Sequence, residues 1–68
     1  MKLVTKSVLN QRKEGNSTAT IIQTIPKGTR VDWYGYVTEC NGSLWYLVDY
    51  KNHLGFCSSK YLNVSRET

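Results

Sequence analysis

The sequence predicts an all-β domain that curls into a small, partly open barrel of five short strands. Val, Ile, Thr, Tyr and Trp are frequent, and apolar residues do not recur at the i, i+3, i+4 spacing of a helix. Turn signals divide the chain at Pro26-Lys27-Gly28 and at Asn41-Gly42. Five short strands do not stay flat with one face wet and the other apolar, so curling into a barrel is the expected arrangement at this size.

The first elements follow in order from the turn signals. Residues 7–12 form a first short strand, and residues 13–18 are polar and contain Gly15 and Asn16, which favours an exposed loop. Residues 20–25 are β-prone and end at the proline-lysine-glycine turn, where proline fixes φ and glycine permits the reversal.

The remaining elements form two consecutive hairpins. A strand at 29–40 returns as a strand at 44–50 through Asn41-Gly42, because both central residues of a type I′ turn need a positive φ. A turn at 51–54 leads to the fifth strand, at 55–58. A single helical turn at 59–61 is then expected before a short extended segment at 62–64.

The first hairpin has a defined register if Asn41 and Gly42 are its two loop residues. The expected cross-strand pairs are Cys40 with Ser43, Val37 with Tyr46, Gly35 with Val48, and Trp33 with Tyr50. Strand alternation then places one apolar set on the interior face: Val31, Trp33, Val37, Leu44, Tyr46, Val48 and Tyr50. The opposite face holds Tyr34, Tyr36, Trp45 and Leu47, with Tyr36 and Trp45 looking outward.

The two cysteines are expected to be free thiols. In the contiguous register Cys57 lies beside Val48, which places it roughly 17 Å from Cys40 at about 3.3 Å per residue. A disulfide spans no more than ~7 Å between Cα atoms. Cys57 is therefore expected to be a small buried apolar residue.

A chain of 68 residues holds one small domain. We expect a lead or linker at 1–6, the barrel at 7–64 and a tail at 65–68. The first ten residues lack the apolar stretch of a signal peptide, and no segment approaches the 18 apolar residues of a membrane span. A domain of this kind that works outside the cell would be exported within a longer chain or released by lysis.

The net charge of +4 favours an anionic partner such as nucleic acid, a membrane surface or a cell-wall polymer. The basic residues are dispersed along the chain, which is also typical of an ordinary solvated surface.

Five short pieces of the sequence occur in a characteristic order: LNQR, a polar loop, IPKGTRV, LWYLVDY and GFCSSKYL. Together they resemble a bacterial SH3 domain over residues 8–62. The residues that carry the resemblance are Leu9, Asn10, Arg12, Lys27, Gly28, Thr29, Trp45, Gly55, Phe56, Tyr61 and Leu62. The chain departs from the family at Gln11, where valine is usual, and at 13–16, where a serine-glycine-proline run is usual.

The resemblance implies an SH3-like barrel that is a non-catalytic targeting module. Such modules occur in bacterial and phage peptidoglycan hydrolases, the autolysins and endolysins, where they bind the cell wall and concentrate a linked enzyme on it. It therefore implies peptidoglycan, through its stem peptide or cross-bridge, as the partner, and the bacterial cell wall as the place of action. The module is expected to belong to a longer chain, either as a single copy or as one of a tandem set.

The candidate ligand-binding residues are Arg12, Tyr36, Trp45, Tyr61 and Gln11. Outward Tyr36 and Trp45, near Tyr61 and the first loop, could form a shallow aromatic groove; alternatively, Trp45 and Tyr61 pack on each other and seal the barrel. Gln11 either lines the groove or is buried with a hydrogen-bond partner. Charged Arg12, Lys13, Glu14 and Asp49 could pair with wall peptides, or could simply be solvated.

Other function classes fit the sequence less well. A small basic barrel that binds single-stranded nucleic acid is the main alternative, but only Arg30 is expected near the outward aromatics, so no nucleic acid partner is expected. No cofactor or metal is expected, because the single histidine, His53, lies on a turn away from both cysteines. A nucleophile with a positioned base is not recognisable either, so catalysis by this domain is not expected.

Overall fold

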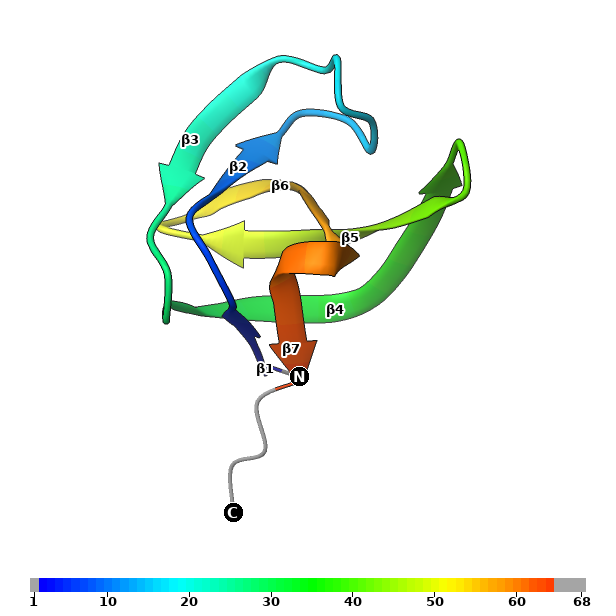
Figure 1. The fold of residues 1–68 in the computed structure, drawn as a ribbon. Coiled ribbons are helices and arrows are strands. Elements are labelled where there is room, and N and C mark those ends of the chain that lie inside the picture. Colours follow the sequence, from blue (N-terminus) through cyan, green and yellow to red (C-terminus); the bar gives the residue numbers. More distant parts are fainter. Residues whose placement is uncertain (1, 65–68) are drawn as a thin grey trace.

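The computed structural model describes residues 2–64, so the expected tail at 65–68 lies outside the described residues. The described chain forms one antiparallel sheet in the order β3-β2-β6-β5-β4-β1-β7, and this sheet is not closed (Figure 1). Its elements are β1 (Lys2–Thr5), β2 (Leu9–Arg12), β3 (Ile21–Ile25), β4 (Arg30–Cys40), β5 (Ser43–Tyr50), β6 (His53–Ser58), the 3-10 helix η1 (Ser59–Tyr61) and β7 (Leu62–Val64). The all-β, partly open fold is confirmed, although the sheet has seven strands rather than five.

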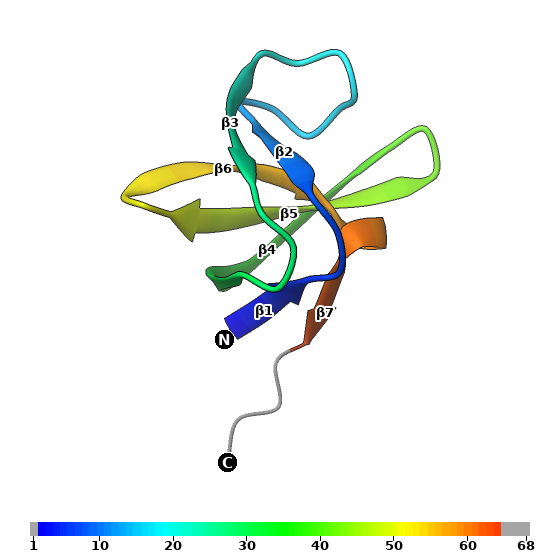
Figure 2. The same ribbon diagram turned by 60° about the vertical axis from the view of Figure 1, so that its left-hand side comes forward.

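The N-terminal strand β1 corrects the expectation of a lead or linker at 1–6. Leu3 is only 1% exposed and stands opposite Val31 of β4, while Lys2 forms a 2.7 Å salt bridge with Asp32. On its other side β1 pairs with β7, and Figure 2 shows the two strands together at one end of the molecule. The strand could not be recognised because four residues are too few to establish an alternation and its partners lie far along the chain.

The core is built from inward side chains of all seven described strands. Its buried members are Leu3, Leu9, Ile25, Val31, Val48, Cys57 and Leu62, and the half-buried Trp33, Tyr46 and Tyr50 pack against them. Burial of each large apolar side chain stabilises the fold by roughly 1.5–3 kcal/mol. Val37 and Leu44, expected inside, are 40% and 45% exposed. They lie near the tip of the β4–β5 hairpin, which projects away from the rest of the sheet (Figure 1).

The β4–β5 hairpin turns where the sequence predicts. Asn41 and Gly42 both have positive φ, at 51° and 80°. The pairs Cys40 with Ser43 and Val37 with Tyr46 are confirmed.

A bulge in β4 overturns the rest of the predicted register. Trp33 stands opposite Val48 instead of Tyr50, because the register shifts between Trp33 and Val37. Within this bulge Gly35 has a φ of +90°, which side chains other than that of glycine rarely adopt. The sequence therefore predicts the pairing correctly near the turn, whereas the bulge shifts the pairing further along the strand.

Both cysteines are free, as predicted. Cys57 lies opposite Tyr46, not beside Val48, and is fully buried in the core. Burial raises the pKa of the Cys57 thiol to about 12, so the thiol is neutral near pH 7.

The other predicted turns are present with small changes in length. Lys51 and Asn52, both with positive φ, form a two-residue turn between Tyr50 and His53, so the turn is shorter than the expected 51–54. The predicted helical turn is η1, and it begins where the Ser58 hydroxyl accepts a 3.4 Å hydrogen bond from the backbone N–H of Lys60.

Candidate functional site

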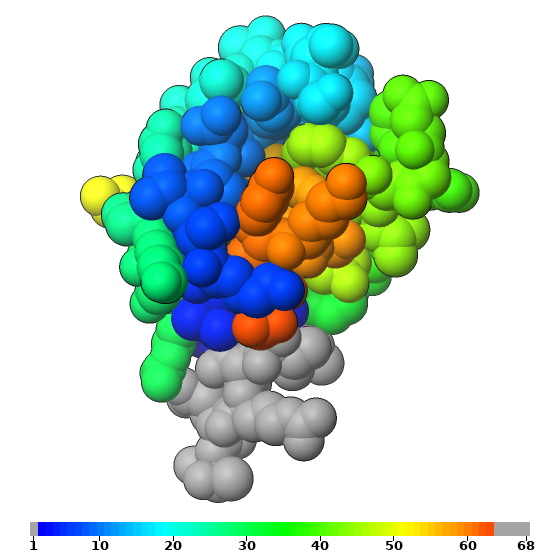
Figure 3. Space-filling view, in the orientation of Figure 1, coloured from blue at the N-terminus to red at the C-terminus, as the bar shows by residue number. Residues whose placement is uncertain are grey.

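A groove of about 440 Å³ opens between β2, the first loop, the tip of the β4–β5 hairpin and η1. Figure 3 shows this face, on which η1 (orange) lies between β2 (blue) and the hairpin (yellow-green). The groove is lined by Val8, Leu9, Asn10, Arg12, Ser17, Cys40, Asn41, Ser43, Trp45, Ser58, Lys60 and Tyr61. These residues come from three stretches that are far apart in the sequence, 8–17, 40–45 and 58–61.

Trp45 forms one wall of the groove from the middle of the sheet. It stands between Thr38 of β4 and Ser58 of β6, on the sheet face opposite the core residue Val48. The first loop packs over this face, because a Cβ added to Gly15 would meet Thr38 and would lie 3.2 Å from the Cβ of Trp45. Trp45 is therefore only 7% exposed, although the sequence predicts the correct face. Its expected outward exposure is wrong because the loop covers it.

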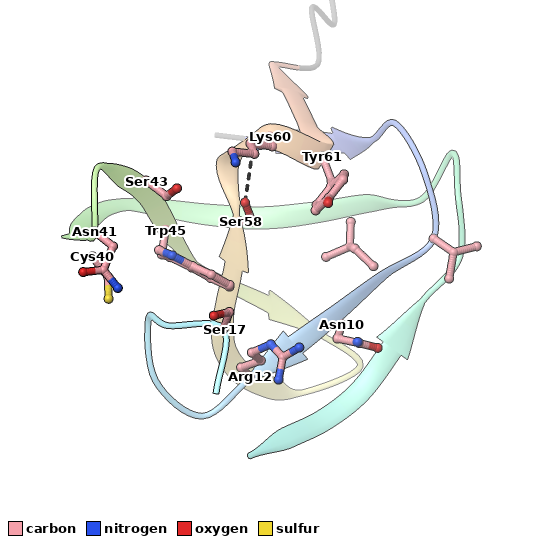
Figure 4. Close-up of a pocket in the computed structure, with 12 residues that line it drawn as sticks. Asn10, Arg12, Ser17, Cys40, Asn41, Ser43, Trp45, Ser58, Lys60 and Tyr61 are labelled. Carbon is pink, nitrogen blue, oxygen red and sulfur yellow. Dashed lines mark hydrogen bonds between the residues drawn. The ribbon is translucent and has the colours of Figure 1, made fainter. Parts of the chain in front are cut away.

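Tyr61 forms the facing aromatic wall and remains open to solvent. It ends η1 and is 45% exposed. In Figure 4 the rings of Tyr61 and Trp45 lie on different sides of the opening. Within residues 2–64 the ring contacts join other pairs, Trp33 with Tyr46 and Tyr36 with Phe56. The alternative in which Tyr61 and Trp45 stack on each other and seal the barrel is therefore not observed.

Two basic side chains complete the groove. Arg12 is half-buried on β2, and its Nη1 donates a 2.9 Å hydrogen bond to the carbonyl oxygen of Ala19, which ties it to the first loop. Lys60 is exposed on η1, and Figure 4 shows it across the opening from Arg12. The groove can thus offer cationic donors together with aromatic surface, a combination that suits a polar ligand with flat or apolar parts.

A comparison with models of known families matches residues 7–63 to the bacterial SH3 domain. The chain belongs to the bacterial SH3 domain family. This family consists of non-catalytic binding domains. No curated protein matches the chain. The matched residues begin just before β2 and end within β7. The strand β1 precedes the part of the chain that the family model covers.

Gln11 of this bacterial SH3 domain is a structural residue and does not line the groove. It is fully buried, and its Nε2 donates to the carbonyl oxygens of Val48 at 3.0 Å and His53 at 2.8 Å. Its Oε1 accepts a 2.8 Å hydrogen bond from Nε2 of Gln23. Of the two readings left open by the sequence, the buried and satisfied glutamine is the observed one. Gln11, predicted as a ligand-binding residue, therefore lies outside the groove lining.

Tyr36 is exposed, but away from the groove. It follows the Gly35 bulge, is 56% exposed and meets Phe56 edge-on, with ring centroids 6.0 Å apart. Its backbone carbonyl accepts a 3.0 Å hydrogen bond from Nε1 of Trp33. Of the five candidate residues, the structure therefore brings Arg12, Trp45 and Tyr61 together and leaves Tyr36 and Gln11 outside.

The other charged candidates also lie outside the groove lining. Lys13 and Glu14 are exposed in the first loop, while Asp49 stands opposite Asp32 and accepts a 3.5 Å hydrogen bond from the Tyr34 hydroxyl. Arg30 pairs with Val4 at the β1 end of β4, far along the strand from Cys40.

Sequence reasoning missed several groove residues. Lys60, Ser17, Asn41 and Ser43 belong to a helical turn, a loop and a hairpin tip that were each predicted, but not as neighbours. The only available signal was the position of these turns at the ends of strands, and the way the open sheet curls decides which turns meet.

The part of the chain that the structure describes contains neither a group of candidate metal ligands nor a helix that could span a membrane. Residues 2–64 contain no cluster of three or more His, Cys, Asp or Glu side chains. His53 is exposed at the start of β6. Among the same residues no helix is long and apolar enough to cross a membrane.

Proposed function

We propose that this bacterial SH3 domain binds the peptide part of peptidoglycan, at the stem peptide or the cross-bridge, and holds a linked peptidoglycan hydrolase on the bacterial cell wall. The observation that carries the proposal is the groove, which joins two aromatic walls to two cationic side chains. A peptide offers apolar side chains, amide planes and charged groups, all of which this lining can contact.

The domain would contribute affinity and position rather than chemistry. Linking a wall-binding module to an endolysin or autolysin raises the concentration of the enzyme at its substrate without any new catalytic group. Tandem copies of the module would strengthen retention by the same linkage. The proposed place of action is therefore the cell wall.

Nucleic acid binding is not favoured by the groove. A single-stranded nucleic acid needs a track of several basic residues beside stacking aromatics. Only Arg12 and Lys60 are basic among the described residues that line the groove, and Arg30 lies elsewhere.

The test is retention of the domain on isolated bacterial cell walls over a salt series. We expect binding to weaken by no more than about tenfold at high salt. Salt does not screen apolar contacts, and it screens charge pairs that are half-buried less than charge pairs that are exposed. Absence of wall binding, together with retention on single-stranded nucleic acid that falls steeply with salt, would contradict the proposal.

A further inference from the structure

The charges that line the groove all have one sign. The described residues of its lining include Arg12 and Lys60 and no aspartate or glutamate. A ligand ammonium group placed there would lose water without gaining a carboxylate partner, whereas a ligand carboxylate would gain two cations.

The acidic side chains of the described chain are held elsewhere. Asp32 forms the salt bridge with Lys2, and Asp49 accepts the hydrogen bond from Tyr34. Glu39 stands opposite Leu44, and strand alternation places both residues on the face opposite to that of Trp45. Glu14 is exposed in the first loop and is not part of the lining.

Arg12 is positioned in advance for a carboxylate. Its hydrogen bond to the Ala19 carbonyl uses one of five guanidinium N–H donors and fixes the side chain against the first loop. Within residues 2–64 neither Arg12 nor Lys60 forms an ion pair. A guanidinium held in place loses little freedom on binding and can donate two parallel hydrogen bonds to one carboxylate.

The neutral polar groups near Arg12 also favour an acceptor-rich ligand. The Oδ1 of Asn10 already accepts a 3.1 Å hydrogen bond from the Thr24 hydroxyl, which leaves its amide N–H groups as donors. Ser17 lies on the same side of the opening in Figure 4, and its hydroxyl can donate as well.

We propose that the groove recognises a peptide segment carrying a free carboxylate, which Arg12 binds directly while Lys60 contributes from the facing wall. This inference rests on the proposed function, because it names the group of the wall peptide that the groove selects. Amine-bearing ends of the same peptides would not be selected.

The experiment compares binding to purified peptidoglycan, freed of other anionic polymers, before and after its carboxyl groups are converted to amides. For the wild-type domain we expect amidation to lower the affinity about tenfold. Arg12→Gln should lower the affinity for untreated peptidoglycan by a similar factor and should make binding insensitive to amidation. Equal binding of the wild type to both preparations would overturn the inference and leave the proposed function standing.

Three further variants separate recognition from general charge and from folding. Lys60→Gln should weaken binding, whereas Lys27→Gln, which removes the same charge from the exposed turn after β3, should not. Arg12→Lys, which keeps the charge, should recover part of the sensitivity to amidation. An equal loss in Lys27→Gln would overturn the inference alone. Wild-type binding that disappears once other anionic polymers are stripped from untreated walls would overturn both the inference and the proposed function. Failure to bind any wall preparation would overturn the proposed function as well.

Discussion

Gln11 of β2 and Gln23 of β3 stand opposite each other and form a 2.8 Å side-chain hydrogen bond, and both side chains also bond to the β5–β6 hairpin. Gln11 also donates to the backbone of Val48 and His53, and Gln23 donates to the carbonyl of Tyr50 at 2.9 Å. This network holds β3 and β2, the strand that forms one side of the groove, against β5 and β6.

Gln11→Leu should therefore destabilise the fold while leaving the groove chemistry intact. The substitution removes the donor to the two backbone carbonyls and one of the two acceptors of the Gln23 amide, which costs about 1–3 kcal/mol. Denaturant unfolding measures this loss, with the exposed Thr20→Ala as a control of unchanged stability. An unchanged free energy of unfolding in Gln11→Leu would contradict the assigned structural role.

Trp45→Ala should act mainly on stability, because the side chain is 7% exposed beneath the first loop. Removing a buried tryptophan costs about 3–5 kcal/mol, which is a large part of the stability of a domain of this size. Thermal or denaturant unfolding measures the effect, and Trp45→Phe should lose much less. A fully stable Trp45→Ala domain would show that the loop does not depend on this contact.

The two thiols should differ in reactivity. Cys40 is half-exposed at the groove and Cys57 is fully buried, so alkylation of the native domain should modify Cys40 only. Mass spectrometry after brief alkylation should show one label per chain, and a second label should appear on unfolding. Two rapid labels in the native state would contradict the burial of Cys57.

Cys57 should also make stability depend on alkaline pH. Its folded pKa of about 12 lies above the ordinary thiol value of 9.0, so the folded state retains a proton that the unfolded state releases. Stability should be constant from this source below about pH 9 and should fall as the pH rises toward 12. The fall should be smaller in Cys57→Ala, and unfolding measured over this range in both proteins gives the difference. Equal slopes would contradict the prediction.

The parts of the fold that depend on local chemistry could be predicted from the sequence. Proline with glycine at 26–28, Asn41-Gly42 and the helical turn at 59–61 all behave as predicted. The strand β1 and the bulge at Gly35 could not be predicted, because distant pairing and sheet curvature create them.

The candidate site also combines residues that the sequence could predict with an arrangement that depends on distant pairing. Arg12, Trp45 and Tyr61 were predicted because they carry the family resemblance or lie on the outward face. The sequence does not show that the first loop buries Trp45, that Gln11 points into the core, or that Lys60 faces Arg12. Each of these depends on how the open sheet brings its loops together.

The central claim is that the groove is the binding surface, and Tyr61→Ala tests it most directly. Tyr61 is a groove wall with 45% exposure, and Tyr34, at 66% exposure, lies outside the groove and provides a matched control. On purified peptidoglycan we expect Tyr61→Ala to bind about tenfold more weakly than the wild type, or about 1.4 kcal/mol, with little change in stability. Tyr34→Ala should bind like the wild type. Undiminished binding by Tyr61→Ala, or an equal loss in Tyr34→Ala, would contradict the claim.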